Sequence, residues 1–156
     1  MKHDFLYSVE REYSVPVERL WQAWTNAAEL EAWYHPTVLS TLAGSVSSEA
    51  TDGGLWTTGI DVPDYGFVAY FYGWYSNVQP LVSLEHTMCY TQSAEEFAAK
   101  DPNSPHHKVK VEFESRGDGK SWVKFSQFGE MPEEQIQATT DGMSSYFDSL
   151  GEFLAR

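Results

Sequence analysis

The sequence predicts an α+β fold in which a curved antiparallel sheet of about six or seven strands wraps around a long C-terminal helix. Three observations predict this arrangement. Two short segments with helical spacing follow the first strand, strand-like segments dominate residues 37–128, and one apolar stripe with helical periodicity runs through residues 133–155. A chain of 156 residues fits one domain with a sizeable core.

The N-terminal part predicts one strand and two short helices. Aromatic and aliphatic residues alternate with polar ones from Phe5 to Tyr13, which is typical of a half-buried strand. Pro16 ends this strand and suits the first turn of a helix over residues 17–25. A second short helix is expected over residues 27–34, because apolar residues again recur at helical spacing before Pro36.

The central part predicts a series of strands. The alternating segments cover residues 38–46 (the weakest candidate), 55–62, 67–78, 82–91, and a hairpin whose arms centre on Val111 and Val123. The hairpin turn is Gly117-Asp118-Gly119. Residues 92–107 are polar and predict no more than one helical turn, over residues 93–98.

The closing helix is expected to begin near Pro132 and to carry a sustained apolar stripe. The stripe consists of Ile136, Thr140, Met143, Phe147, Leu150 and Leu154, spaced four, three, four, three and four residues apart. Gly142 and Gly151 each weaken such a helix by about 1 kcal/mol relative to alanine. A close backbone approach or space left for a ligand would explain these glycines.

Composition excludes several function classes. The formal net charge is −13, and no Lys or Arg occurs between Arg19 and Lys100, so neither nucleic acid nor an anionic membrane is an expected partner. Cys89 is the single cysteine, which rules out an intrachain disulfide. The N-terminus lacks a signal-peptide pattern and no apolar stretch is long enough to span a membrane, so we expect a cytoplasmic protein.

Several motifs, in this order, resemble a known family. They are residues 15–25, Leu30 with Trp33-Tyr34-His35-Pro36, Gly53-Gly54-Leu55-Trp56, Gly73-Trp74-Tyr75 with Val78-Gln79-Pro80, and residues 142–154. The chain is similar to the SRPBCC superfamily of START-like and birch-pollen-allergen proteins. Within that superfamily it resembles the AHSA-type family, homologues of the activator of the heat-shock chaperone ATPase. The resemblance implies one helix-grip domain over residues 1–156, an apolar cavity between sheet and last helix, and no shared catalytic residues.

The surplus of aromatic residues, 15% of the chain, indicates either a ligand pocket or a solid aromatic core. The candidate ligand-binding residues are Trp56, Phe71, Tyr75, His86, Met88, Phe113, Met143 and Phe147. Of these, Phe147 and Met143 are expected to touch the ligand, with Trp56 and His86 across the gap. Aromatic residues on both faces of residues 67–74 also suggest that a second subunit could cover one sheet face, giving a homodimer.

No catalytic or metal site is predicted. His86 is the best candidate for an acid or base, but a buried, hydrogen-bonded histidine without a catalytic role is the favoured interpretation. Four residues could in principle bind zinc: His86, Cys89, His106 and His107. However, His86 and Cys89 are three residues apart on a predicted strand, so their side chains should point to opposite faces. No phosphate-binding loop or cofactor motif is present.

Three functions follow from these observations. The leading hypothesis is binding of a small hydrophobic or amphipathic ligand between the sheet and the helix over residues 133–155. The second is a chaperone-ATPase-activator-like or stress-response adaptor that contacts a heat-shock chaperone. The third is a polyketide-cyclase-like enzyme. The volume and lining of any interior cavity should distinguish them.

Overall fold

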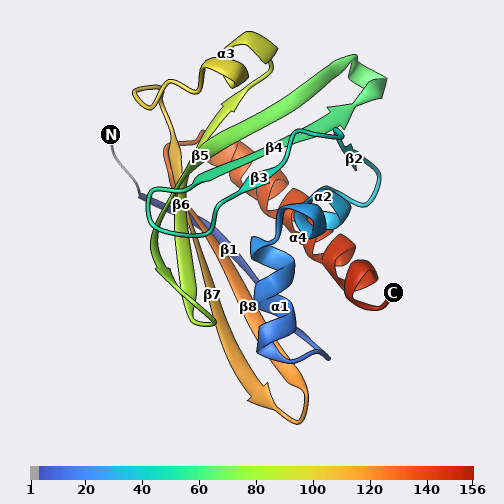
Figure 1. The fold of residues 1–156 in the computed structure, drawn as a ribbon. Helices are drawn as coiled ribbons and strands as arrows, with labels where there is room; N and C mark the ends of the chain where they lie inside the picture. Colours follow the sequence, from blue (N-terminus) through green and yellow to red (C-terminus); the bar gives the residue numbers. More distant parts are fainter. Residues whose placement is uncertain (1–3) are drawn as a thin grey trace.

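The structure, a computed structural model, describes residues 4–156 and confirms the predicted α+β helix-grip architecture. One curved antiparallel sheet has the strand order β1-β8-β7-β6-β5-β4-β2, and β3 also pairs with β4. The long helix α4 lies across this sheet, with the two short helices α1 and α2 beside it (Figure 1). The strands are β1 (Asp4–Tyr13), β2 (Ser40–Thr41), β3 (Ser47–Ser48), β4 (Leu55–Val62), β5 (Phe67–Gln79), β6 (Ser83–Thr91), β7 (His107–Gly117) and β8 (Lys120–Gly129).

The four α-helices of residues 4–156 are α1 (Val17–Thr25), α2 (Ala27–Trp33), α3 (Ala94–Ala99) and α4 (Glu133–Leu154). Their starts follow from local chemistry. The side chain of Asn26 accepts a hydrogen bond from the backbone N–H of Glu29 at 3.0 Å and so caps α2. Ser93 caps α3 in the same way through the N–H of Glu96 at 3.2 Å, as its position before the helical turn predicts. No helix in residues 4–156 combines the length and apolarity needed to cross a membrane.

The weak strand predicted over residues 38–46 is mostly a loop, and this prediction is corrected. Only Ser40–Thr41 forms a strand there, and Ser47–Ser48 forms another beyond it. Gly44 adopts a left-handed φ of +80°, which turns the chain and interrupts any ladder. The loop is held on β4 by separate bonds instead: Leu42 N–H donates to the Gly59 carbonyl, and Gly59 N–H donates to the Ser45 hydroxyl.

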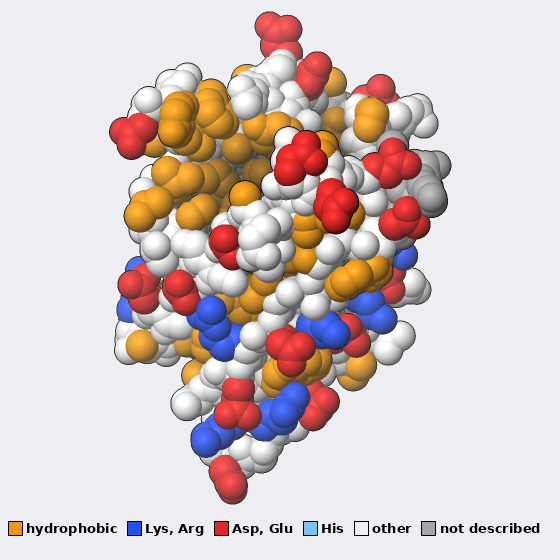
Figure 2. All heavy atoms as spheres, turned by 180° about the vertical axis from the view of Figure 1, so that it is seen from behind, with side chains coloured by type: hydrophobic (Ala, Val, Ile, Leu, Met, Phe, Trp, Pro, Cys, Tyr) orange, Lys and Arg blue, Asp and Glu red, His pale blue; other side chains and the backbone are white. Residues whose placement is uncertain are grey.

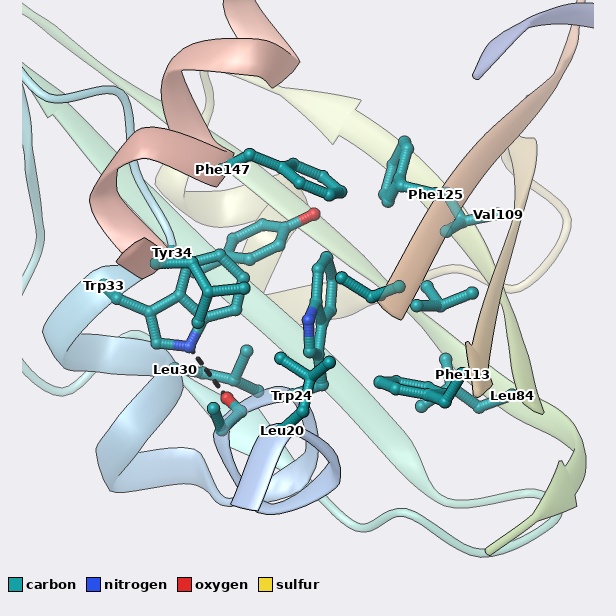
Figure 3. Packing of buried hydrophobic residues seen from close by; sticks show 14 of the residues in the cluster. Leu20, Trp24, Leu30, Trp33, Tyr34, Leu84, Val109, Phe113, Phe125 and Phe147 are labelled. Atoms are coloured by element: carbon teal, nitrogen blue, oxygen red, sulfur yellow. Dashed lines mark hydrogen bonds between the residues drawn. The ribbon is translucent and has the colours of Figure 1, made fainter. Parts of the chain in front are cut away.

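Aromatic rings fill the core between the helices and the sheet (Figure 3). Trp24 of α1 packs edge-on against Trp33 of α2, with ring centroids 4.8 Å apart, and lies 6.0 Å from Phe147 of α4. The indole N–H of Trp33 donates to the carbonyl of Ala23 at 2.8 Å, which ties α2 to α1. Phe125 of β8 completes the layer and is fully buried. This cluster joins α1, α2 and α4 to the sheet.

The outer face of β5 is partly covered by α3 from the same chain. The rings of Tyr70 and Phe97 stack with centroids 4.5 Å apart, and Tyr72 also lies near Phe97. Seen from behind, hydrophobic side chains gather in the upper half of the molecule, whereas Lys and Arg lie in the half that holds the β7–β8 hairpin (Figure 2). In this view the basic residues are confined to the lower part of the molecule, whereas Asp and Glu occur in both halves (Figure 2). Homodimerisation through this face stays a prediction.

Candidate ligand-binding site

A cavity of about 630 Å³ lies between the sheet and the N-terminal half of α4. Its volume is within the range of small-molecule sites, roughly 300–1,000 Å³. The sheet and α4 both contribute to its walls, because Thr139, Gly142, Met143 and Tyr146 of α4 face strands β1 and β4 to β8. The segments before β7 and before α4 also border the cavity.

The walls of the cavity are largely apolar. Trp56 of β4, Phe71 of β5 and Met88 of β6 line the sheet side, and Met131 and Met143 line the helix side. Aromatic rings offer broad flat surfaces, whereas methionine side chains adapt their shape to a neighbour. This combination suits an apolar molecule whose shape the site can follow.

Three tyrosines place polar groups on this apolar surface. Tyr7 comes from β1, Tyr34 follows α2, and Tyr146 belongs to α4. Burial raises the pKa of each phenol, and the neighbouring hydroxyl of Tyr146 raises the pKa of Tyr7 and Tyr34 further. All three hydroxyls are therefore uncharged at neutral pH.

A chain of hydrogen bonds connects Tyr7 with the segment before α4. The Tyr7 hydroxyl lies 2.6 Å from Gln127 Oε1, and Gln127 Nε2 lies 2.7 Å from His107 Nδ1. His107 Nε2 in turn lies 3.0 Å from the carbonyl oxygen of Glu130. Gln127 is buried, so this chain satisfies a polar group that would otherwise be costly to enclose.

The two glycines of α4 differ in their surroundings. A Cβ on Gly142 would meet no atom within 4 Å, and Gly142 lines the cavity, so this glycine leaves space there. A Cβ on Gly151 would lie 3.5 Å from a ring carbon of Tyr13, which is an ordinary contact, so no close approach requires glycine there. Of the two explanations expected from the sequence, open space occurs at Gly142 and a close backbone approach occurs at neither glycine.

The structure divides the predicted ligand-binding residues into two groups. Trp56, Phe71, Met88 and Met143 line the cavity, and contact of these four with a ligand stays a prediction. Tyr75, His86, Phe113 and Phe147 lie instead in the packed core.

The contacts of the second group show why. Phe147 is one turn beyond Met143, where α4 meets Trp24, and it is fully buried. Phe113 packs against Trp21 with ring centroids 5.0 Å apart. The Tyr75 hydroxyl is engaged with the hydroxyl of Ser48 at 2.7 Å.

His86 lies against the far side of the cavity wall rather than in it. Its ring stacks on Trp56 with centroids 4.0 Å apart, and its Nδ1–H donates to the carbonyl of Thr87 at 2.8 Å. Burial lowers the pKa of His86 to about 4, and the Thr87 carbonyl opposes this only in part. The side chain is thus a neutral ring at neutral pH, enclosed in the core.

Sequence reasoning missed the polar residues of the cavity. Val123, Phe125 and Gln127 occupy every second position on the inward face of β8. An amide at the end of such an apolar series is a signal that sequence reasoning could have used. Tyr146 is three residues after Met143, but the apolar stripe as traced passes through Phe147 instead. Tyr34 belongs to the motif Trp33-Tyr34-His35-Pro36, which indicates the family but not the pocket.

Among residues 4–156, no group of three or more His, Cys, Asp or Glu side chains is arranged to hold a metal ion. His86 faces the core inside the sheet, whereas Cys89 is paired in register with Tyr72 and lies near it on the other face. The separation of these two side chains is as the strand geometry predicts.

Comparison with known proteins gives a family match and many structural matches. The family described as "Activator of Hsp90 ATPase homolog 1-like protein" matches residues 14–155. No curated protein matches significantly.

Solved structures share the fold at low sequence identity. The crystal structure of the AHSA1 protein from Silicibacter pomeroyi is 21% identical, with a TM-score of 0.78 and coverage of 96% of both chains. A solution structure from Staphylococcus epidermidis is 23% identical, with a TM-score of 0.74, covering 95% of this chain and 88% of the other. DynU16, a protein of the dynemicin biosynthetic locus, is 16% identical with a TM-score of 0.70, and the match covers 97% of this chain but 47% of DynU16.

Proposed function

Because this chain belongs to the Activator of Hsp90 ATPase homolog 1-like family, we propose that it binds a small hydrophobic or amphipathic molecule between its sheet and α4. The observation that carries the proposal is the cavity of about 630 Å³, lined by aromatic and methionine side chains. Gly142 supports it, since a glycine in mid-helix costs stability and here borders empty space.

Apolar burial provides the binding energy. Each square ångström of apolar surface removed from water contributes about 25 cal/mol, and the ligand and the wall both contribute where they touch. Trp56, Phe71 and Met88 offer such surface on the sheet side, with Met143 opposite. Part of this free energy offsets the translational and rotational freedom that the ligand loses on binding. The remainder should give a small apolar molecule a measurable affinity.

Native mass spectrometry of the protein purified from its own cells tests the proposal. We expect a retained small molecule, visible as added mass. Gly142→Phe should lose this mass because the new ring enters the cavity, whereas Gly142→Ala at the same position should keep it. A protein that carries no added mass and also binds no apolar compound offered to it would contradict the proposal.

A second candidate rests on the family itself, whose description names activation of the Hsp90 ATPase. We propose contact with a heat-shock chaperone as this alternative, through an outer surface rather than the cavity. Stimulation of the chaperone's ATP turnover by this protein would support it. The same stimulation by Gly142→Phe would show that the activity does not depend on the cavity. Cytoplasmic location and a role in stress response stay predictions.

A further inference from the structure

The hydrogen-bond chain at Tyr7 has a definite direction. The carbonyl of Glu130 can only accept, so His107 carries its proton on Nε2. In the neutral imidazole, Nδ1 then accepts from the amide N–H of Gln127. The amide oxygen of Gln127 is left to face Tyr7, and the Tyr7 hydroxyl donates to it at 2.6 Å. The Tyr7 proton is thus committed, and its hydroxyl can only accept from a ligand.

The hydroxyl of Tyr34 is in the opposite situation. Tyr34 is only 4% exposed, and within residues 4–156 its hydroxyl makes no hydrogen bond. Its ring reaches from the end of α2 toward Phe147, in the space between α4 and β8 (Figure 3). The Tyr34 hydroxyl is not fully enclosed but borders the cavity, so an acceptor on a ligand placed there would gain a hydrogen bond from it.

Tyr146 adds a second free donor beside Tyr34. The two rings meet edge-on with centroids 4.9 Å apart. Burial raises the pKa of Tyr34, and the neighbouring Tyr146 hydroxyl raises it further. The Tyr146 hydroxyl also makes no hydrogen bond within the described chain. Two neighbouring donors suit an oxygen with two lone pairs, which describes a carbonyl group.

Charge excludes one large class of ligands. No Lys or Arg lines the cavity among residues 4–156, and Glu130 is the acidic residue on its border. A carboxylate buried there would lose its hydration without gaining a cation. The site therefore disfavours fatty acids and other anions, although their apolar chains would fit the walls.

Resting on the ligand-binding function above, we propose that the cavity selects uncharged apolar carbonyl compounds, whose oxygen accepts hydrogen bonds from Tyr34 and Tyr146. The apolar body of the ligand then lies against Trp56, Phe71 and Met88. The free donors specify the oxygen. Among the described residues the lining contains His106 and His107 but no Lys or Arg, and His107 is already bonded to Gln127 and Glu130, so the site disfavours the anion.

Three probes of similar shape test this selection by isothermal titration calorimetry. Benzophenone carries the carbonyl, diphenylmethane replaces it with a methylene, and diphenylacetate carries a carboxylate at the same carbon. We expect benzophenone to bind about tenfold more tightly than diphenylmethane and at least about tenfold more tightly than diphenylacetate.

Tyrosine variants identify the donors. Tyr34→Phe should reduce the preference for benzophenone over diphenylmethane, and Tyr34→Phe combined with Tyr146→Phe should abolish it while diphenylmethane binds as before. Tyr90→Phe is the matched control, because Tyr90 also borders the cavity but is 53% exposed and its hydroxyl accepts from Gln92 at 2.7 Å. Thermal unfolding of each variant checks the fold, which loss of an unpartnered hydroxyl should not weaken.

The outcomes separate this proposal from the function on which it rests. If all three probes bind but the double variant keeps the preference, or if diphenylacetate binds as tightly as benzophenone, the carbonyl selection is wrong and ligand binding stands. If none of the three binds the unmodified protein, ligand binding in this cavity fails and the carbonyl selection fails with it.

Discussion

The burial of His86 makes the stability of the protein depend on pH in a defined way. Its ring is 3% exposed and stacks on Trp56, and burial lowers its pKa to about 4 from an ordinary value of about 6.5. In the unfolded chain His86 therefore binds a proton below about pH 6.5, whereas in the folded protein it stays neutral down to about pH 4. Between these values, protons bind preferentially to the unfolded chain.

The sign and size of the effect follow directly. The contribution of neutral His86 is complete above about pH 6.5, falls as the pH decreases, and levels off below about pH 4. One pKa unit corresponds to about 1.4 kcal/mol, so the full loss is about 3 kcal/mol. For a protein of ordinary stability, about 5–15 kcal/mol, this is a substantial fraction.

The assay compares the unmodified protein with His86→Phe. Phenylalanine keeps a ring against Trp56 but cannot take up a proton, and it loses the bond to the Thr87 carbonyl, worth about 1 kcal/mol. Urea unfolding at several pH values between 7.5 and 4 measures both free energies of unfolding, and the other histidines and carboxylates cancel in the difference. We expect the difference to change by about 3 kcal/mol in favour of His86→Phe as the pH falls. Parallel pH profiles for the two proteins would refute the reasoning.

Two further comparisons test the packing of the fold. A methyl group on Gly73 would overlap the carbonyl oxygen of Thr87, so Gly73→Ala should lower the free energy of unfolding by at least about 2 kcal/mol. Gly151→Ala has its nearest contact at 3.5 Å and should instead raise the free energy of unfolding by about 1 kcal/mol. Denaturant unfolding of both variants checks the opposite signs. The indole N–H of Trp24 has no hydrogen-bond partner in the described chain, whereas the indole N–H of Trp33 donates to the carbonyl of Ala23. Trp33→Phe should therefore lower the free energy of unfolding by about 1–3 kcal/mol more than Trp24→Phe does in the same measurement. Equal losses for the two variants would contradict this explanation.

The helices, the long strands and their order could be predicted from the sequence, because periodicity and turn chemistry act over a few residues. Pro16 directly precedes α1, and the side chains of Asn26 and Ser93 cap α2 and α3. The loop over residues 38–46 was mistaken for a strand because its path depends on Gly44 and on scattered bonds to β4, which no alternation of residue types reveals.

Which inward-facing side chains border empty space depends on the three-dimensional packing and could not be predicted from the sequence. Met143 and Phe147 share one helix stripe, and His86 and Met88 share one strand face, yet one member of each pair lines the cavity and the other is in the core. Residue type and periodicity establish that a side chain points inward, but not how far away the opposite wall lies. The cavity is the space that remains where the sheet curves away from the first half of α4, and its volume depends on how the distant elements pack together.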